Sequence, residues 1–391
     1  MLNTPFSPWP AFTQEEAAAV SEVLLSNRVN YWTGEQCQRF EAEFADWIGA
    51  KHAIAMANGT VALDAALAVF NLAQGDEVIV TPRTFLASAS CIVNAGAKPV
   101  FADVDPISQN ITAETIAAVI SPKTKGIICV HLAGWPCDMA PIMALANSLG
   151  LFVIEDCAQA HGARYQGQAV GTLGHIAAWS FCQDKIMTTG GEGGMVTTNN
   201  TDYWQRMWSL KEHGKNWHKV HETSTTSGFR WLHDSFGTNW RMAEIQAVIG
   251  RLQLKNLAQW QEQRLANAMR IWQCAQTITG LRVSLPPETV SHAAYKCYLF
   301  IEPCELASAW CRDRILTEIN VRGVPCYSGS CSEIYLERAF DGTGLRPQRR
   351  LPQAKSLGET SLMFLVHPTL TEAEITKTCA VLRAVMKLAA K

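Results

Sequence analysis

Short apolar runs alternate with stretches of helical periodicity through the first half of the chain. The capping box Thr13-Gln14-Glu15-Glu16 predicts a helix that continues to Leu25. Apolar runs of strand length follow this helix. They span residues 77–80, 99–104, 126–130, 151–154, 177–181 and 195–198. This alternation is typical of an α/β domain, in which helices cover both faces of a mostly parallel sheet.

The second half has a different pattern. Apolar residues recur every three or four positions from 240 to about 278, which predicts one long helix connecting two domains. Beyond this helix, a strand is predicted at 298–301 and a final helix at the capping box Thr371-Glu372-Ala373-Glu374. We therefore expect two domains. Residues 1–254 would form a large α/β domain that includes an N-terminal arm, and residues 255–391 a smaller C-terminal α+β domain.

The composition is that of a folded protein of ordinary enzyme size. Of the 391 residues 48% are hydrophobic, and 33 basic against 35 acidic residues give a net charge of −2. Nucleic-acid binding would need a basic stripe, so we expect no such partner. The 13 cysteines are scattered without a Cys-x-x-Cys pair, as in proteins with reduced thiols. No apolar stretch has the length of a membrane span, and residues 1–10 lack a signal-peptide pattern, so we expect a cytoplasmic protein.

Lys185 follows one apolar run and precedes the glycine turn Gly190-Gly191-Glu192-Gly193-Gly194. An amine held between two strands can form a Schiff base with an aldehyde cofactor or a carbonyl substrate, if its surroundings lower its pKa. Most lysines beside loops are solvated surface charges instead. Residues elsewhere in the chain are needed to decide between these two interpretations.

Asp156 lies at the C-terminal end of the strand predicted from the apolar run 151–154, where open α/β sheets bind their ligands. A carboxylate at this place can hold the protonated ring nitrogen of pyridoxal phosphate, whose ring is an electron sink for carbanions. An aspartate after a strand also commonly caps the next helix. Both interpretations of Asp156 stay open on these grounds.

Asn58-Gly59-Thr60 opens a helical pattern, so its backbone N–H groups and the Thr60 hydroxyl form an anion seat at a helix N-terminus. Simple helix capping explains most sequences of this kind. Ser180 could add a second hydroxyl to the same phosphate. Phe85 ends another strand and could stack on a cofactor ring, although a lone aromatic residue is more often part of the core.

In order and spacing, these residues resemble one family over almost the whole chain. It is the DegT/DnrJ/EryC1/StrS group of sugar aminotransferases, which are pyridoxal-phosphate enzymes of the aspartate aminotransferase fold, fold type I. The matching motifs are Tyr31-Trp32-Thr33-Gly34, Phe40-Glu41, Asn58-Gly59-Thr60, Glu155-Asp156, Ser180-Phe181, residues 185–194, Lys211-Glu212-His213-Gly214, Gly237-Thr238-Asn239-Trp240-Arg241-Met242 and Val366-His367-Pro368. The ordered set is far more specific than any one motif.

The resemblance implies a pyridoxal 5'-phosphate site and assigns its residues. Lys185 would hold the cofactor aldehyde, Asp156 would contact the ring nitrogen and Gln159 the ring hydroxyl. Phe85 would cover one face of the ring. The phosphate would be bound by Gly59, Thr60 and Ser180.

The same resemblance implies a homodimer with shared active sites. In the family, the asparagine that matches Asn239 reaches the phosphate of the neighbouring subunit. We also expect Trp32, Thr33 and Arg241, which lie in matching motifs, to contact the substrate.

Two positions bear on the chemistry within the family. Asn58 stands where the family more often has serine, which removes one possible hydroxyl contact to the phosphate. Some members carry histidine in place of the lysine and act as sugar dehydratases. Lys185 therefore favours amino transfer, because transamination needs an amine that exchanges with substrate and moves the proton.

Five of the thirteen tryptophans fall between residues 204 and 240, interleaved with four histidines. The rings are Trp204, Trp208, Trp217, Trp231 and Trp240, and the histidines are His213, His218, His221 and His233. The histidine spacing does not suit a metal site, and we expect no metal. A cluster in a long loop favours a packed interface, so we expect these rings at the dimer contact.

We therefore expect an aminotransferase that moves an amino group from L-glutamate to the keto carbon of a nucleotide-linked sugar. The pyridoxamine form of the cofactor would carry the amino group between two half-reactions, in amino-sugar and polysaccharide biosynthesis. One alternative is an aminotransferase acting on a cyclitol or another non-nucleotide ketone. A second is a non-catalytic regulatory protein that binds the cofactor, which would have no need of a proton shuttle.

Overall fold

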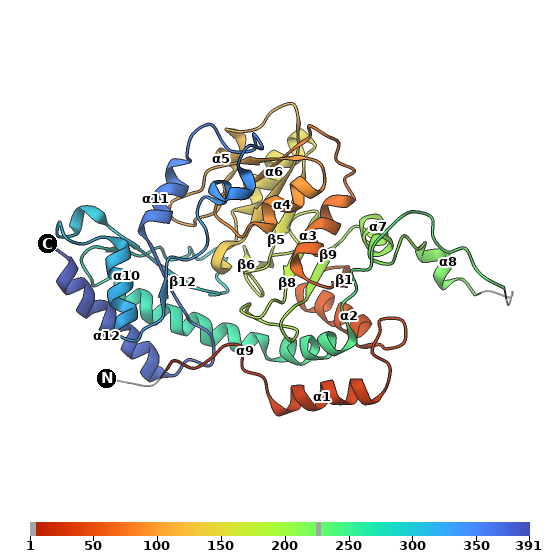
Figure 1. Cartoon of the computed structure of the whole chain (residues 1–391), viewed down its shortest axis with the longest axis horizontal. Coiled ribbons are helices and arrows are strands. Elements are labelled where there is room, and N and C mark those ends of the chain that lie inside the picture. Colours follow the sequence, from red (N-terminus) through yellow and green to blue (C-terminus); the bar gives the residue numbers. More distant parts are fainter. Residues whose placement is uncertain (1–4, 224–227) are drawn as a thin grey trace.

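The computed structural model describes residues 5–223 and 228–391, so the first four residues of the N-terminal segment and residues 224–227 of the tryptophan-rich stretch lie outside it. The fold is α/β, with a mostly parallel sheet and a second, smaller antiparallel sheet (Figure 1). The helices are α1 Gln14–Leu25, α2 Gln36–Ile48, α3 Gly59–Ala68, α4 Ala87–Asn94, α5 Ala113–Ala117, α6 Met139–Leu149, α7 Thr201–Lys211, α8 Trp217–His221, α9 Glu244–Ala275, α10 Arg312–Val321, α11 Pro352–Thr360 and α12 Glu372–Ala389. The predicted capping boxes at Thr13 and Thr371 are both confirmed.

The large sheet has seven strands in the order β1-β9-β8-β5-β4-β2-β3. The strands are β1 His52–Met56, β2 Glu77–Val80, β3 Lys98–Phe101, β4 Thr124–Val130, β5 Phe152–Asp156, β8 Ile176–Ser180 and β9 Gly194–Thr198. Only β9 runs against its neighbours. It does so because a loop without a helix joins β8 to β9, and a parallel connection would need a longer crossover. That loop carries Lys185.

All six strands predicted for the first half are confirmed; β2 has the predicted ends, and the other five are shifted at one end or both. The strand predicted at 99–104, β3, ends at Phe101, since the chain leaves the sheet and the Asp103 carboxylate accepts hydrogen bonds from Gln353 N and Ala354 N, both at 2.9 Å. The sequence analysis missed β1. Its residues His52-Ala53-Ile54-Ala55-Met56 are rich in alanine and poor in β-branched residues, so their intrinsic strand signal is weak.

Alternate residues of the strands enter different cores, as the strand period of two requires. Ile54 and Met56 pack with α3, α4 and α7 on one face, whereas Ala53 and Ala55 pack with α2 and α9 on the other. At the far end of that second face, α5 and α6 cover β4 and β5. Both faces are therefore buried, and polar side chains can gather only at the strand ends.

The helix α9 spans both parts of the molecule and links the large sheet to the C-terminal part (Figure 1). It begins at Glu244, four residues later than predicted, because Trp240 and Arg241 are still extended against β1: Ala57 N donates to the Trp240 carbonyl at 2.8 Å. Among the described residues, no helix combines the length and the apolar character needed to cross a membrane.

The C-terminal part has its own core around a four-stranded antiparallel sheet in the order β10-β12-β14-β13. These strands are β10 Leu281–Arg282, β12 Cys297–Ile301, β13 Cys326–Tyr327 and β14 Ser361–Phe364, and a third, small sheet joins β11 Val290–Ser291 to β6 Arg164–Tyr165 and β7 Gln168–Ala169. The helices α10 and α12 and the end of α9 cover the four-stranded sheet. We keep the domain boundary at 254/255 as a proposal, and α9 passes through it without a break.

Candidate active site

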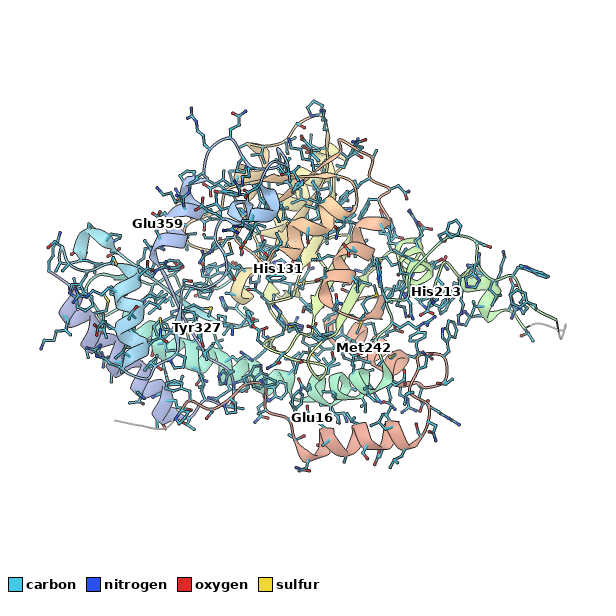
Figure 2. The ribbon with its side chains drawn as sticks, viewed as in Figure 1. Glu16, His131, His213, Met242, Tyr327 and Glu359 are labelled. Carbon is cyan, nitrogen blue, oxygen red and sulfur yellow. The ribbon has the colours of Figure 1, made fainter. Side chains whose placement is uncertain are left out.

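A cavity of about 1350 Å³ opens where the parallel strands end and the C-terminal part begins. Asp156 at the end of β5 and Ser180 at the end of β8 form its floor. From the C-terminal part, Tyr327 lines the cavity. Figure 2 shows Tyr327 in the C-terminal part of the molecule, apart from His131, which follows β4. This is the position at which open α/β sheets bind ligands.

Asp156 is buried, and both of its carboxylate oxygens accept hydrogen bonds. Ser88 Oγ donates to Oδ2 at 2.8 Å and Ala158 N donates to Oδ1 at 3.1 Å. A turn follows Asp156 and not a helix, so the helix-cap interpretation is wrong. Burial raises the pKa of the Asp156 carboxyl, and these two hydrogen bonds offset part of the rise. A cation placed against this carboxylate would relieve the cost of its burial.

Lys185 lies in the loop after β8 and lines the same cavity, half-buried. Its Nζ atom lies 5.2 Å from the centre of the Tyr295 ring. The loop is held through the backbone, since Lys185 N donates to the Cys182 carbonyl at 3.0 Å and the Lys185 carbonyl accepts from Trp9 Nε1 at 2.7 Å. These backbone contacts hold the loop, and the half-buried side chain lines the cavity beside Tyr295.

The N-terminus of α3 meets the end of β8 at very short range. A Cβ atom at Gly59 would lie 2.6 Å from Ser180 Cβ, so only glycine lets the helix end approach this closely. Asn58 caps α3, with Val61 N donating to its Oδ1 atom at 3.0 Å. The Asn58 side chain is thus occupied, which leaves the first-turn backbone N–H groups and the hydroxyls of Thr60 and Ser180 as the anion seat.

Gln159 and Phe85 complete the wall of the cavity near Asp156. Gln159 is buried, and its Oε1 atom accepts from Ala133 N at 2.8 Å, which leaves its amide N–H groups as donors toward the cavity. Phe85 is 72% exposed and does not belong to the core, contrary to the alternative considered for a lone aromatic residue. A flat apolar ring beside a buried carboxylate suits an aromatic cationic ligand.

Together these residues fit pyridoxal phosphate. The buried carboxylate of Asp156 suits a pyridinium, the helix end at Gly59 and Thr60 suits a phosphate, and the Lys185 amine suits an aldehyde. The sequence analysis missed Ser88, whose hydroxyl holds Asp156, and Tyr295, which comes from the C-terminal part. No sequence motif marks either residue, because each is brought to the site by the tertiary fold alone.

Four of the predicted site residues lie outside this cavity. They are Asn239, Trp32, Thr33 and Arg241. Trp32 Nε1 and Arg241 Nε donate to the same Glu212 Oε2 atom, at 3.0 and 2.7 Å, and Asn239 pairs with Glu212 through the backbone. Thr33 is exposed and donates to the Asn30 carbonyl at 3.2 Å. Within one chain, Trp32, Asn239 and Arg241 therefore form a separate cluster around Glu212, to which Thr33 makes no hydrogen bond in the structure.

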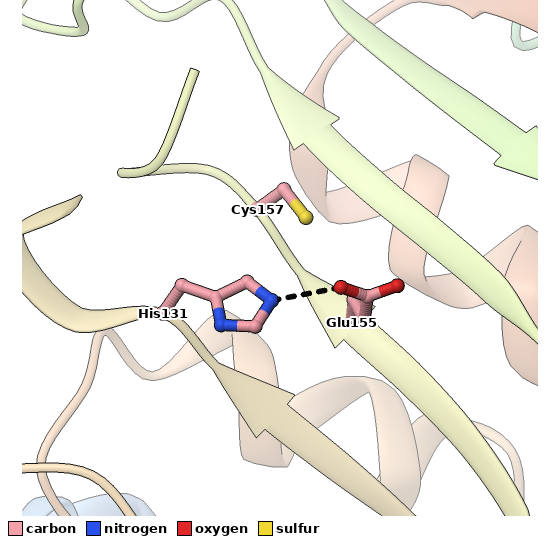
Figure 3. Close-up of side chains that lie close together, drawn as sticks. All are labelled: His131, Glu155 and Cys157. Atoms are coloured by element: carbon pink, nitrogen blue, oxygen red, sulfur yellow. Dashed lines mark hydrogen bonds and ion pairs between the residues drawn. The ribbon is translucent and has the colours of Figure 1, made fainter. Parts of the chain in front are cut away.

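One group of possible metal ligands was found among the described residues: His131, Glu155 and Cys157, all buried (Figure 3). His131 Nδ1 accepts from Cys137 N at 2.9 Å, so Nε2 carries the proton and donates to Glu155 at 3.0 Å. Glu155 also accepts from three backbone N–H groups, of Gly171, Leu173 and Gly174. Burial raises the pKa of the Cys157 thiol. The ring nitrogens of His131 and the carboxylate of Glu155 are thus already used in hydrogen bonds next to Asp156.

Comparison with known proteins identifies the family. A family model described as "DegT/DnrJ/EryC1/StrS aminotransferase family" matches residues 10–383. The chain belongs to this family. The fold superposes on the X-ray structure of an aminotransferase from Psychrobacter cryohalolentis with a TM-score of 0.96, at 61% identity over 98% of this chain and 99% of that one. This similarity confirms the expected fold of pyridoxal-phosphate-dependent aminotransferases.

Two curated relatives are similar over most of their length. The chain is 35% identical over 389 residues, 98% of this chain and 96% of the relative, to UDP-N-acetyl-3-dehydro-alpha-D-glucosamine 3-aminotransferase of Acidithiobacillus ferrooxidans. It is 33% identical over 362 residues, 91% of this chain and 88% of the relative, to dTDP-3-amino-3,4,6-trideoxy-alpha-D-glucose transaminase of Streptomyces venezuelae. The protein is thus an aminotransferase, as the sequence analysis expected.

The tryptophan-rich stretch of this aminotransferase is not one long loop, contrary to expectation, because α7 and α8 form within it. Trp217 lies edge-on against Trp204 and Trp208, with ring centres 4.6 and 4.7 Å apart. These three rings pack within one chain. Trp231 is instead 81% exposed, on a segment that extends away from the sheet beside α8 (Figure 1).

A buried network of charges supports the cluster around Glu212 in this aminotransferase. Lys211 Nζ lies 3.0 Å from Glu212 Oε1 and 3.7 Å from the centre of the Tyr31 ring. Tyr31 OH donates to Glu41 Oε2 at 3.4 Å, and Ala55 N donates to Glu41 Oε1 at 2.8 Å. Burial raises the pKa of the Glu41 carboxyl from 4.5 to about 7, although Lys211 opposes the rise.

We predict that Glu41→Gln stabilises the aminotransferase at pH 8. Glu41 has a higher pKa in the folded than in the unfolded state, so wild type loses stability as pH rises from 4.5 to about 7. Glutamine keeps the acceptor for Ala55 N and removes the charge, so the gain should be roughly 1–3 kcal/mol at pH 8 and vanish near pH 4.5. Denaturant unfolding of both proteins across this pH range measures it.

The matched control is Glu35→Gln, since Glu35 is an exposed acid that pairs with Arg39 on the surface. It should give no pH-dependent gain. A Glu41→Gln protein that is less stable than wild type at pH 8 would contradict the prediction.

Proposed function

We propose that this aminotransferase moves the amino group of L-glutamate to the keto carbon of a nucleotide-linked sugar, with pyridoxal phosphate as its cofactor. The observation that carries the proposal is the cavity that joins Lys185, Asp156 and the N-terminus of α3. The two curated relatives support the substrate class, because both are named for aminotransfer to sugars linked to UDP or dTDP. The cavity also has room for a substrate beside the cofactor.

Each cavity residue has a task in this proposal. When bound, the pyridoxal ring supplies the electron sink for negative charge at the donor carbon, and its pyridoxamine form stores the amino group between the half-reactions. Lys185 would hold the aldehyde, and once the donor amine has displaced it, its free Nζ would move a proton from the donor carbon to the cofactor and do the reverse for the sugar. Asp156 keeps the ring nitrogen protonated, and Ser88 and Ala158 N hold its carboxylate in place.

Transfer of a nitrogen label tests the proposal. The purified holoenzyme is incubated with ¹⁵N-glutamate and keto sugars linked to UDP, dTDP or GDP, and products are analysed by mass spectrometry. Label in a nucleotide-linked amino sugar is expected, and none with the Lys185→Ala variant. Label that enters only cyclitols or other free ketones would contradict the sugar-nucleotide assignment.

We further propose a homodimer in which the cluster around Glu212 serves the partner's cavity. Two observations support it. Asn239, Trp32 and Arg241 gather at one place outside their own chain's cavity. Beside them, Phe229, Trp231 and Phe236 are largely exposed, as expected for a surface that a second subunit covers.

Mixed dimers of two inactive variants should regain activity. Lys185→Ala removes the amine of one site, and Asn239→Asp puts a negative charge against the phosphate of the neighbouring site. A mixed dimer then has one site with both wild-type residues and one with both changes. Turnover of glutamate and keto sugar is measured after dissociation and remixing. Up to about a quarter of wild-type activity is expected, since random pairing makes half of the dimers mixed and gives each one intact site.

The control is each variant taken alone through the same dissociation and remixing, which should stay inactive. Proven subunit exchange without any regain of activity, or a fully active monomer, would rule out the shared site.

A further inference from the structure

Arg264 is a buried cation without an anion. It lies on α9, is only 2% exposed, and its Nε and Nη2 atoms have no hydrogen-bond acceptor among the described residues. Its Nη1 atom has one long contact, 3.5 Å from the Tyr295 carbonyl, and its guanidinium lies 4.9 Å from the centre of the Trp9 ring. Burial lowers the pKa of Arg264 to about 9, so the group is still charged at neutral pH. A charge buried without a partner is costly, which calls for an explanation.

The surroundings of Arg264 carry an excess of positive charge. Arg264 lines the cavity together with Lys185 and Lys296. The Lys296 side chain is largely buried, and its Nζ atom has one carboxylate partner within the described chain, Asp184, at 4.0 Å. Burial also lowers the pKa of His367, the next basic group in the wall, to about 3, so it is neutral. Burial lowers the pKa of Lys296 to about 8, so Lys296 and Arg264 are both mostly charged at neutral pH, with Asp184 as the nearby carboxylate.

We propose that Arg264 and Lys296 bind a carboxylate of the amino donor. The proposal rests on the proposed function, in which the donor is an amino acid and reacts at Lys185 in the same cavity. A guanidinium with unused donors can bind a carboxylate through two parallel hydrogen bonds, and a nearby ammonium adds a third donor. The phosphate of the cofactor has its own seat at Gly59, Thr60 and Ser180. The donor carboxylate thus supplies the anion that Arg264 lacks in the chain itself.

Glutarate, a dicarboxylate without an amine, is the probe for this subsite. Its dissociation constant for the pyridoxal-phosphate holoenzyme is measured by calorimetry. Arg264→Met and Lys296→Met should each weaken glutarate binding at least tenfold, because each loses a charge-assisted hydrogen bond. Arg264→Lys should bind with intermediate affinity. The absorption spectrum of the bound cofactor should not change, since neither residue holds it.

The matched control is Arg270→Met, on the same helix. Arg270 is partly exposed and pairs with Glu372 at 3.6 Å, so its loss should leave glutarate affinity unchanged. A purely structural role for Arg264 makes a different prediction. Arg264→Met would then lower the thermal midpoint (Tm) of the holoenzyme without ligand and leave glutarate affinity intact. Our proposal expects this Tm to stay or rise, because methionine fills the space without a buried charge.

Two outcomes would overturn the proposal. One is unchanged glutarate affinity in Arg264→Met. The other is a selective loss of UDP-glucuronate affinity, measured against UDP-glucose, in Arg264→Met or Lys296→Met while glutarate affinity stays normal. That result would assign the two cations to an acidic sugar. Glutarate binding needs no acceptor sugar and no turnover. Glutarate binding can therefore be lost while ¹⁵N transfer is seen, or be seen while ¹⁵N transfer is absent. The carboxylate subsite and the proposed function are thus tested separately.

Discussion

Replacing Lys185 with alanine should abolish amino transfer and leave the protein folded. The side chain is half-buried and lines the cavity, while its loop is held by backbone hydrogen bonds to Cys182 and Trp9, which alanine keeps. In the proposed function this amine holds the aldehyde and moves the proton, so turnover should fall at least about 10³-fold without it. Transfer of ¹⁵N from glutamate and the unfolding midpoint measure the two effects.

Chemical labelling gives an independent check on Lys185. Borohydride reduction of the wild-type holoenzyme should attach the cofactor covalently to the peptide that contains Lys185. The control Lys123→Ala, at an exposed lysine away from the cavity, should keep full turnover and the same labelled peptide. Wild-type turnover in Lys185→Ala, or a label on another lysine, would show that the assignment is wrong.

Replacing Asp156 with asparagine should leave the cofactor bound but slow turnover by a hundredfold or more. Asparagine keeps an acceptor for Ala158 N, and the Ser88 hydroxyl can accept from the new amide, so the local structure should persist. An amide cannot hold a ring proton by charge, and the loss of about 2.7 kcal/mol of transition-state stabilisation corresponds to that factor. The rate of a single turnover with glutamate, without the keto sugar, measures the effect on the donor half-reaction alone.

Ser88→Ala is the graded control for Asp156. It keeps the carboxylate and removes the hydroxyl that positions it at 2.8 Å, so turnover should fall less than in Asp156→Asn, by about tenfold. A near-normal rate for Asp156→Asn would remove this residue from the mechanism.

Lys185 and Asp156 could be singled out from the sequence because each lies just after an apolar run of strand length. Asp156 follows the apolar run 151–154 with only Glu155 between, Lys185 follows the run 177–181, and the ends of adjacent parallel strands meet at one edge of a sheet. The structure places β5 beside β8, with Asp156 opposite Ala178. Ordered motifs along the chain then indicated the family, which the family match confirmed.

Other features needed long-range contacts that no local pattern records. The strand β1 has a weak intrinsic signal and forms because β9 offers it a partner. In the tryptophan-rich stretch, local spacing suggested a loop, whereas Trp208 is buried against α3 and its neighbours and holds a helix in place.

By itself, the sequence predicted most helices and strands in their order and the aminotransferase reaction, and it singled out Lys185 and Asp156 as candidates. These depend on periodicity and on motifs a few residues long, which are encoded locally. Only the tertiary structure decided what else meets them: Ser88 behind Asp156, Tyr295 beside Lys185, and Arg264 unpaired in the cavity wall. It also separated Arg241 from that cavity. Burial and pairing arise from contacts between distant segments, so they exist only once the chain has folded.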